Sequence, residues 1–237
     1  TTIEYKRMWS RARALIGKRF DYRKLKNDDG DEELGEYFAA GTTTAGRKIR
    51  TVEITRELCE LIIFMVNSYI RPTDIKNLQH KHVEVLRNEH TYLRLSLPVS
   101  KKHDMPIVTM PIAVEVYERV TAFNKASERG VSAEDYVFFP NYAKRDYALK
   151  QLQRQFDVLM WNLGLSKGAK DEDRTIYSLR HTCIMYRLMY GEKTDVVTLA
   201  RNARTSPEMI DRFYAAQLKA EDNIEMLQSR RRKTPKQ

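Results

Sequence analysis

The sequence predicts a mainly α-helical protein that contains one small antiparallel β-hairpin. Apolar residues recur at the helical period of 3.6 residues in several segments that turn residues separate. Near the middle of the chain, a shorter segment alternates apolar and other residues with the period of two that strands show. The chain has 237 residues, 42% of them hydrophobic, which is enough to form a core in one large domain with at most a small appendage.

The first half of the chain opens with a basic stretch, residues 6–26, in which apolar residues from Tyr5 to Ile16 have helical spacing. An acidic, polar segment at residues 27–33 follows and is expected to be a solvated loop. The clearest helical pattern runs from about residue 52 to residue 69. Pro72 then favours the start of a new helical turn.

The period-two segment comes next and ends in a polar turn at residues 100–105, after which residues 107–110 are apolar again. This order predicts a β-hairpin with Lys101 and Lys102 near its tip. The alternating apolar residues of its first strand are Leu93, Leu95, Leu97 and Val99.

Helical patterns occupy most of the second half. A glycine follows two of them and is typical of a helix end. In the last helix, Ser206 is the expected N-cap and Pro207 the first helical residue, so that Tyr214 lies about two turns into it. The four preceding helices are predicted over residues 112–123, 152–163, 178–190 and 195–202.

The charge balance favours a polyanionic partner. Lys and Arg number 42 against 32 Asp and Glu, which gives a net charge of +10 and favours nucleic acid first and an anionic membrane surface second. No stretch of the sequence approaches the roughly 18 consecutive apolar residues that a membrane span requires. Cys59 and Cys183 fall in helical patterns without a pairing motif, so we expect reduced core residues in a cytosolic protein.

Three separated segments have the residue types that would surround a phosphate group. Arg71 stands at the junction of two predicted helices, and Arg180 stands at the start of another. The third segment, residues 199–214, contains Thr205 and ends at Tyr214.

In this order, with a hairpin lysine between the first two, these segments resemble the two arginine boxes and the tyrosine box of the tyrosine recombinase, or phage integrase, family. The resemblance covers roughly residues 47–227. It implies the catalytic-domain fold of that family and an enzyme for site-specific DNA recombination, as in the integration and excision of mobile elements. The catalytic residues that it implies are Arg71, Lys101, Tyr177, Arg180, Thr205 and Tyr214.

The chemistry of that family explains these residue types. Tyr214 would attack a phosphodiester and hold the broken strand through a 3′-phosphotyrosyl bond, with no metal ion or other cofactor. Arg71 and Arg180 would hold the phosphoryl oxygens, on which negative charge builds in the transition state. Lys101, with Lys102 as the alternative, would protonate the leaving 5′-oxygen, and Asp74 would support Arg71 or a neighbouring basic residue.

The sequence departs from the family at two positions. Tyr177 stands where the family usually has histidine, and Thr205 stands where it usually has histidine or tryptophan. Either side chain can donate a hydrogen bond to a phosphate oxygen, but neither can exchange a proton near pH 7 as histidine does. These departures keep open a weak or inactive DNA-binding module. A second enzymatic alternative is a DNA-relaxing enzyme of the type IB topoisomerase kind, which shares the chemistry but acts as a monomer.

The resemblance also implies how the chain is organised and what it binds. Residues 1–26 would be an N-terminal helix or linker that remains of a missing DNA-binding domain, residues 27–228 the catalytic domain, and residues 229–237 a basic flexible tail. The partners would be double-stranded DNA and further copies of the chain, four on one DNA assembly, in the cytoplasm with the nucleoid. Residues 216–227 could form the C-terminal helix that family members exchange between subunits.

The histidines have simpler explanations. His80 and His82 would face a metal ion if both lay on one strand, but no third ligand is evident, so a metal site is not expected. His181 is expected to pack behind the site and not to serve as the base.

Overall fold

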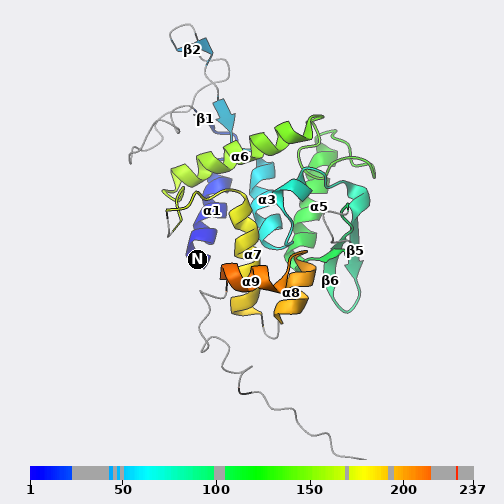
Figure 1. Cartoon of the computed structure of the whole chain (residues 1–237). Coiled ribbons are helices and arrows are strands. Elements are labelled where there is room, and N and C mark those ends of the chain that lie inside the picture. The colour runs from blue at the N-terminus through cyan, green and yellow to red at the C-terminus, as the bar shows by residue number, and fades with distance from the viewer. Residues whose placement is uncertain are drawn as a thin grey trace, which may run out of the picture.

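The computed structural model describes residues 1–22, 43–44, 47–48, 51–98, 105–168, 171–191, 195–214 and 228. This part of the chain is mainly helical with small antiparallel sheets, which confirms the predicted fold class (Figure 1). The helices are α1 (Thr2–Ala14), α3 (Arg56–Val66), α4 (Pro72–Ile75), the 3-10 helix η1 (His80–His82), α5 (Pro111–Ala126), α6 (Arg145–Asn162), α7 (Tyr177–Tyr190), α8 (Val196–Asn202) and α9 (Pro207–Tyr214). The strands are β1 (Arg19–Asp21), β2 (Thr43–Thr44), β3 (Arg47–Lys48), β4 (Thr51–Glu53), β5 (Val83–Arg87), β6 (Thr91–Leu95) and β7 (Ile107–Val108).

Helix α3 lies at the centre of the fold, and α1, α5, α6 and α7 pack around it (Figure 1). Leu58, Leu61 and Phe64 have no exposed surface, as expected for a helix that is apolar on nearly all sides. The Thr55 side chain caps its N-terminus by accepting from the Leu58 N–H at 3.3 Å. The Gln155 side chain of α6 accepts in turn from the Thr55 N–H at 3.0 Å, so α6 fixes the place where α3 begins.

The predicted start of this helix at about residue 52 is wrong. Residues Thr51–Glu53 form strand β4, which pairs antiparallel with β1 so that Val52 lies opposite Phe20. Both side chains are buried. Residues 51–53 fit the helical pattern in the sequence, but their pairing with a distant segment makes them a strand. Helix α1 packs on α3 and α6 and buries Met8 in the same core. The division of the chain at residue 26 stays a prediction.

The predicted hairpin is confirmed, although its first strand ends at Leu95 and does not continue to Leu97. Strands β6 and β7 pair antiparallel with Leu95 opposite Ile107, and these two side chains are completely buried. Strand β5, which the periodicity did not reveal, pairs with β6 and completes a three-stranded sheet that packs on α5. Its side chains are partly or fully exposed, so no clear apolar pattern marks it. The hairpin tip with Lys101 and Lys102 lies outside the described residues.

The helices of the second half lie close to where they were predicted, except that α6 begins at Arg145, seven residues before the predicted start. Asp195 caps α8 through the Val197 N–H at 2.9 Å, and Ser206 caps α9 through the Met209 N–H at 3.3 Å. Cys59 and Cys183 are buried free thiols, as expected. Among the described helices, none has both the length and the apolar character needed to cross a bilayer. Residues 216–227 and 229–237 are outside the described residues.

Arg145 at the start of α6 connects this helix to the segments that precede it. Its guanidinium donates to the Lys76 carbonyl at 2.6 Å, directly after α4, and to three carbonyls just before α6. The guanidinium also lies 3.8 Å from the centre of the Tyr136 ring. This one side chain therefore fixes the C-terminal end of α4, the short helix that begins at Arg71.

We expect Arg145→Met to lower the free energy of unfolding by about 2–4 kcal/mol, because the four carbonyls lose a charged donor inside the fold. Urea denaturation followed by circular dichroism measures the change. Lys144→Met is the matched control, since Lys144 is exposed and precedes Arg145 in the chain. An equal effect of the two substitutions would show that the Arg145 contacts do not stabilise the fold.

Candidate active site

Arg71 occupies the N-cap position of α4, with Pro72 as the first helical residue. The Asp74 carboxylate accepts from the Arg71 N–H at 3.3 Å and lies 3.9 Å from one terminal nitrogen of its guanidinium. Asp74 therefore supports Arg71, as the sequence suggested. The Arg71 side chain keeps 23% of its surface exposed.

Arg180 lies in the first turn of α7 and is only 2% exposed. Its two terminal nitrogens donate to the carbonyls of Tyr69 and Ala203. Hydrogen bonds of this charge-assisted kind compensate for part of the cost of burying a guanidinium. The end of the α3 segment and the turn between α8 and α9 are thus joined through one arginine.

The same turn also receives Arg71, whose guanidinium donates to the Arg204 carbonyl. Because Ala203 and Arg204 are neighbours in the chain, the two guanidinium groups approach adjacent carbonyls of one turn. Arg204 has φ +52° and Tyr69 has φ +57°, in a region of backbone conformation that residues other than glycine rarely occupy. Strained backbone of this kind tends to gather at functional sites, and here it presents the carbonyls that both arginines use.

Thr205 and Tyr214 follow this turn. The Thr205 N–H donates to the Ala200 carbonyl at 2.9 Å, and α9 starts two residues later and is described as far as Tyr214. Nothing is described of the Tyr214 side chain. The ring of Phe213, the preceding residue, lies 6.2 Å from the His181 ring, so this part of α9 lies over the first turns of α7.

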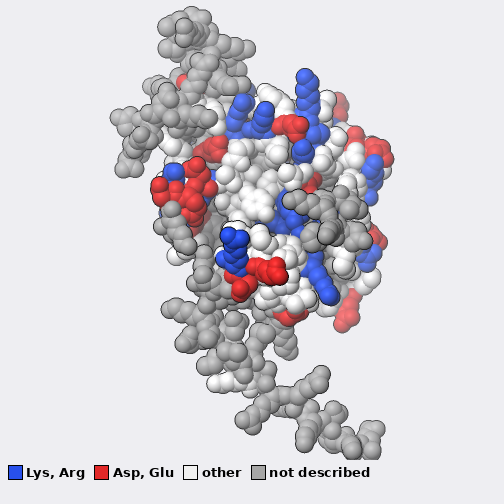
Figure 2. Space-filling model, viewed as in Figure 1, with Lys and Arg blue, Asp and Glu red and all other residues white. Residues whose placement is uncertain are grey.

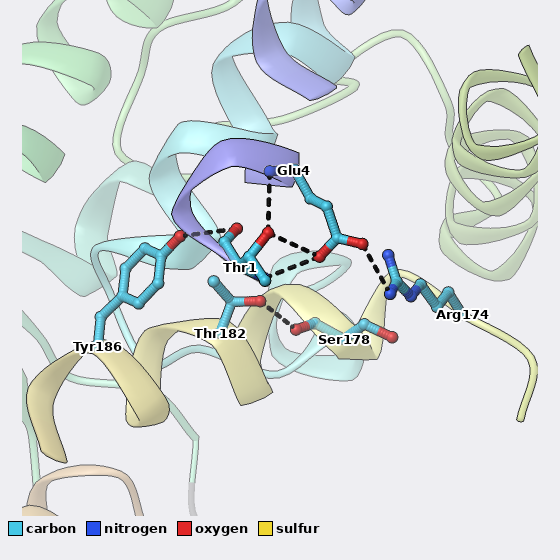
Figure 3. Close-up of polar contacts among 6 residues, drawn as sticks. All are labelled: Thr1, Glu4, Arg174, Ser178, Thr182 and Tyr186. Atoms are coloured by element: carbon cyan, nitrogen blue, oxygen red, sulfur yellow. Dashed lines mark hydrogen bonds and ion pairs between the residues drawn. The ribbon is translucent and has the colours of Figure 1, made fainter. Parts of the chain in front are cut away.

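Tyr177, the first residue of α7, is 38% exposed, and its ring packs edge-on against His181 at 4.9 Å. Together with Phe213, these two rings line a groove of about 860 Å³ between α1, the segment before α7 and α7 itself. Side chains that make polar contacts with one another also line the groove (Figure 3). One of these contacts is the ion pair between the Glu4 carboxylate and Arg174, at 3.1 Å.

Two residues that the sequence did not single out attach the hairpin to the turn. The Arg204 side chain, 1% exposed, donates to the Pro98 carbonyl at 3.1 Å. The Asn202 amide binds both the N–H and the carbonyl of Val108, at 2.8 and 2.9 Å. The segment after β6 and strand β7 therefore both contact the turn that holds Arg71 and Arg180. Lys101 itself lies outside the described residues, three positions after Pro98.

The guanidinium groups of Arg71 and Arg180 meet at adjacent carbonyls of the turn, and the Arg204 side chain extends from the same turn to Pro98. Among these described residues, the Asp74 carboxylate lies beside Arg71. Positive charge therefore exceeds negative charge in this cluster, which favours an anionic ligand. Figure 2 shows basic side chains in the middle of the viewed face, in the area between α3 and α8 of Figure 1.

The His80–His82 pair does not lie on a strand, because η1 includes both residues. His80 contacts the Tyr117 hydroxyl at 2.8 Å, and the His82 ring accepts from the Gln79 N–H at 3.2 Å. Within the part of the chain that the structure describes, no group of three or more His, Cys, Asp or Glu side chains could hold a metal ion.

No protein-family model matches this chain, and no curated protein matches it either. The fold is similar to a solved structure of XerA recombinase, with 16% sequence identity and a TM-score of 0.48 over 75% of this chain. That match spans 59% of the XerA chain. The fold is also similar to the integrase of transposon Tn1549, solved in complex with transposon right end DNA, with 12% identity and a TM-score of 0.46. This second match covers 88% of this chain and 75% of the integrase chain.

We expect His181 to make the protein less stable in acid. Burial, and then the neighbouring Arg180 charge, lower the pKa of His181 from its ordinary value of 6.5. The unfolded chain therefore binds a proton more readily than the folded one. The contribution of neutral His181 to stability is complete above the ordinary pKa and is lost as the pH falls through the lowered value.

The free energy of unfolding, measured in urea at about pH 7.5 and about pH 5.5, should fall less for His181→Gln than for the original protein, because glutamine does not titrate. His90→Gln, at an exposed position, is the control and should keep the full loss. An undiminished loss in His181→Gln would contradict the expectation.

Proposed function

We propose that this chain is the catalytic domain of a tyrosine recombinase, which breaks and rejoins double-stranded DNA through a covalent bond to Tyr214. One observation carries the proposal. Arg71 and Arg180, from distant parts of the sequence, meet at the turn directly before Thr205, and Tyr214 lies on the helix that follows this turn. Two guanidinium groups at one place suit a phosphodiester, which gains charge on its oxygens in the transition state.

A DNA phosphate would compete with the backbone carbonyls for these guanidinium groups. The anionic oxygens of a phosphate form stronger charge-assisted hydrogen bonds than neutral carbonyls do. The Arg71 side chain, 23% exposed, would meet the phosphate first. Arg180, which is buried, would reach it as the turn at Ala203 and Arg204 shifts. On this proposal, DNA binding and the movement of one turn complete the site.

In the reaction, the Tyr214 oxygen forms a bond to phosphorus while the bond from phosphorus to the 5′-oxygen breaks. The phenol, with an ordinary pKa of about 10, loses its proton to solvent water, and positive charge nearby favours that loss. Lys101 would give a proton to the leaving 5′-oxygen. Thr205 and Tyr177 would donate hydrogen bonds to phosphate oxygens in place of histidine. Attack of a 5′-hydroxyl on the phosphotyrosine reverses every step and restores the DNA.

The biological setting is part of the proposal. The net charge of +10 supports a DNA partner, and a recombination reaction between two duplexes calls for several protomers, which we propose to be four. Integration or excision of a mobile element, in the cytoplasm, is the expected role. We likewise propose, for the complete protein, recombinase activity, a DNA substrate and assembly from several protomers.

A DNA-binding module without turnover is the second candidate. Arg180 is 2% exposed, and Tyr177 and Thr205 cannot exchange protons near neutral pH, so the domain could bind a phosphate and fail to cleave. The two candidates differ in whether a covalent bond to DNA forms.

We expect the protein to form a denaturant-resistant adduct with nicked DNA duplexes, without added metal ion or nucleotide. A library of duplexes with random sequence around the nick serves as substrate, since the short cleaved strand diffuses away and traps the adduct. Tyr214→Phe should abolish the adduct, because it lacks the nucleophilic hydroxyl. Sequencing the trapped DNA then identifies a preferred site.

The control is Tyr147→Phe, which removes a hydroxyl from an exposed tyrosine of α6 and should leave the adduct unchanged. Tight DNA binding with no adduct would support the binding module instead. With an adduct in hand, relaxation of plasmid DNA without strand exchange would point to a topoisomerase-like activity.

Arg71→Ala and Arg180→Ala should each slow cleavage at the selected site by about 3 kcal/mol in barrier, or roughly 100-fold, as the loss of one oxyanion donor does. DNA affinity should change far less. Arg180→Ala should in addition lower the free energy of unfolding by about 1–3 kcal/mol, because two buried carbonyls lose their donor.

Single-turnover cleavage, DNA titration and urea denaturation measure the three effects. Arg87→Ala, which removes an exposed arginine of β5, is the control. Equal losses in affinity and in cleavage rate would contradict a catalytic role for the two arginines.

A further inference from the structure

Arg204 is a charged residue at a buried position, and its backbone has a positive φ. The residue is 1% exposed, and its φ of +52° is one that glycine adopts at lower cost. Burial of a guanidinium is also costly unless the surroundings compensate for it. Glycine would fit this backbone more easily and would bury no charge, so the contacts that the arginine side chain makes are of interest.

The contacts of Arg204 connect the turn to the hairpin and to Arg71. Its side chain donates to the Pro98 carbonyl at 3.1 Å, beyond the end of β6, and its own carbonyl accepts from Arg71. The preceding carbonyl, that of Ala203, accepts from Arg180. One side chain thus anchors the turn to the sheet, and the two carbonyls of that turn align the two guanidinium groups.

A second anchor holds the turn from the other side of the hairpin. The Asn202 amide binds the backbone of Val108 in β7 at 2.8 and 2.9 Å. The turn is therefore hydrogen-bonded to both sides of the hairpin. Of these contacts, the bond from Arg204 comes from the residue whose own carbonyl accepts from Arg71.

We propose that Arg204 is a positioning residue for the phosphate site: anchored on Pro98, it sets the place of the turn and thereby the alignment of Arg71 and Arg180. The inference rests on the proposed function, because it assigns a role within the same site. Arg204 touches no reacting atom on this view and acts through the other two arginines.

The test compares cleavage of two nicked duplexes of the selected sequence. One has the ordinary phosphate at the cleavage position, and the other has a methylphosphonate there, which is neutral and needs less positive charge around it. Arg204→Met and Arg204→Gly should slow cleavage of the ordinary phosphate about 10- to 100-fold, since misplacement by about 1 Å can cost about 100-fold. With the methylphosphonate, the loss should shrink to within about 3-fold, as it should for Arg71→Ala.

A double variant provides the second readout. Added to Arg71→Ala, Arg204→Met should cost less than about a further 3-fold, because residues that act through one another are not additive. A general weakening of the fold would instead multiply with the Arg71→Ala loss and would be the same for both substrates. Arg201→Met, at an exposed position of α8 near the turn, is the control and should cleave both substrates at the original rate.

The outcomes separate the inference from the proposed function. If the original protein forms no adduct with the ordinary phosphate, the proposed function fails, and this inference fails with it. If the original protein cleaves, equal losses on both substrates or full additivity would overturn the positioning role alone. Arg204→Gly suits the backbone at this position and serves where Arg204→Met does not fold. Failure of both variants to fold would make Arg204 a residue of the fold and would also overturn the inference.

Discussion

The candidate site depends on one interaction, the meeting of two guanidinium groups on adjacent carbonyls of the turn between α8 and α9. Arg180 is almost completely buried, and a buried charge requires polar partners. The carbonyls of Tyr69 and Ala203 supply them, and the neighbouring carbonyl of Arg204 accepts from Arg71. The end of the α3 segment, the start of α7 and the start of the α9 segment must therefore come together wherever this pairing forms.

Packing and hydrogen bonds elsewhere in the fold hold the segments of this junction in place. The apolar helix α3 packs against four other helices, which gives a rigid base at the point where the chain turns toward Arg71. Arg145 holds the far end of α4, while Arg204 and Asn202 tie the turn to the hairpin. Helix ends and turns on a rigid base are the usual location of binding and catalytic groups.

Local signals explain what the sequence could predict. Helices α8 and α9 were predictable because Asp195 and Ser206 are caps that act on neighbouring N–H groups, and the hairpin was predictable from alternation. Non-local contacts explain what it could not predict. Strand β4 pairs with a distant segment that contains Phe20, and Arg204 donates to the distant Pro98 carbonyl. The burial of Arg204 was not predictable, because arginines are mostly exposed. The roles of Lys101 and Tyr214 stay predictions, because they require side-chain positions outside the described residues.

The most direct measurement is a crystal structure of the Tyr214→Phe protein with a duplex that contains the selected site. The account predicts that Arg71 and Arg180 leave their carbonyl partners and bind the oxygens of a single phosphate, with the ring at position 214 facing that phosphorus opposite the 5′-oxygen. Guanidinium groups that remain on the carbonyls of Tyr69, Ala203 and Arg204, with the DNA phosphates held elsewhere, would contradict it.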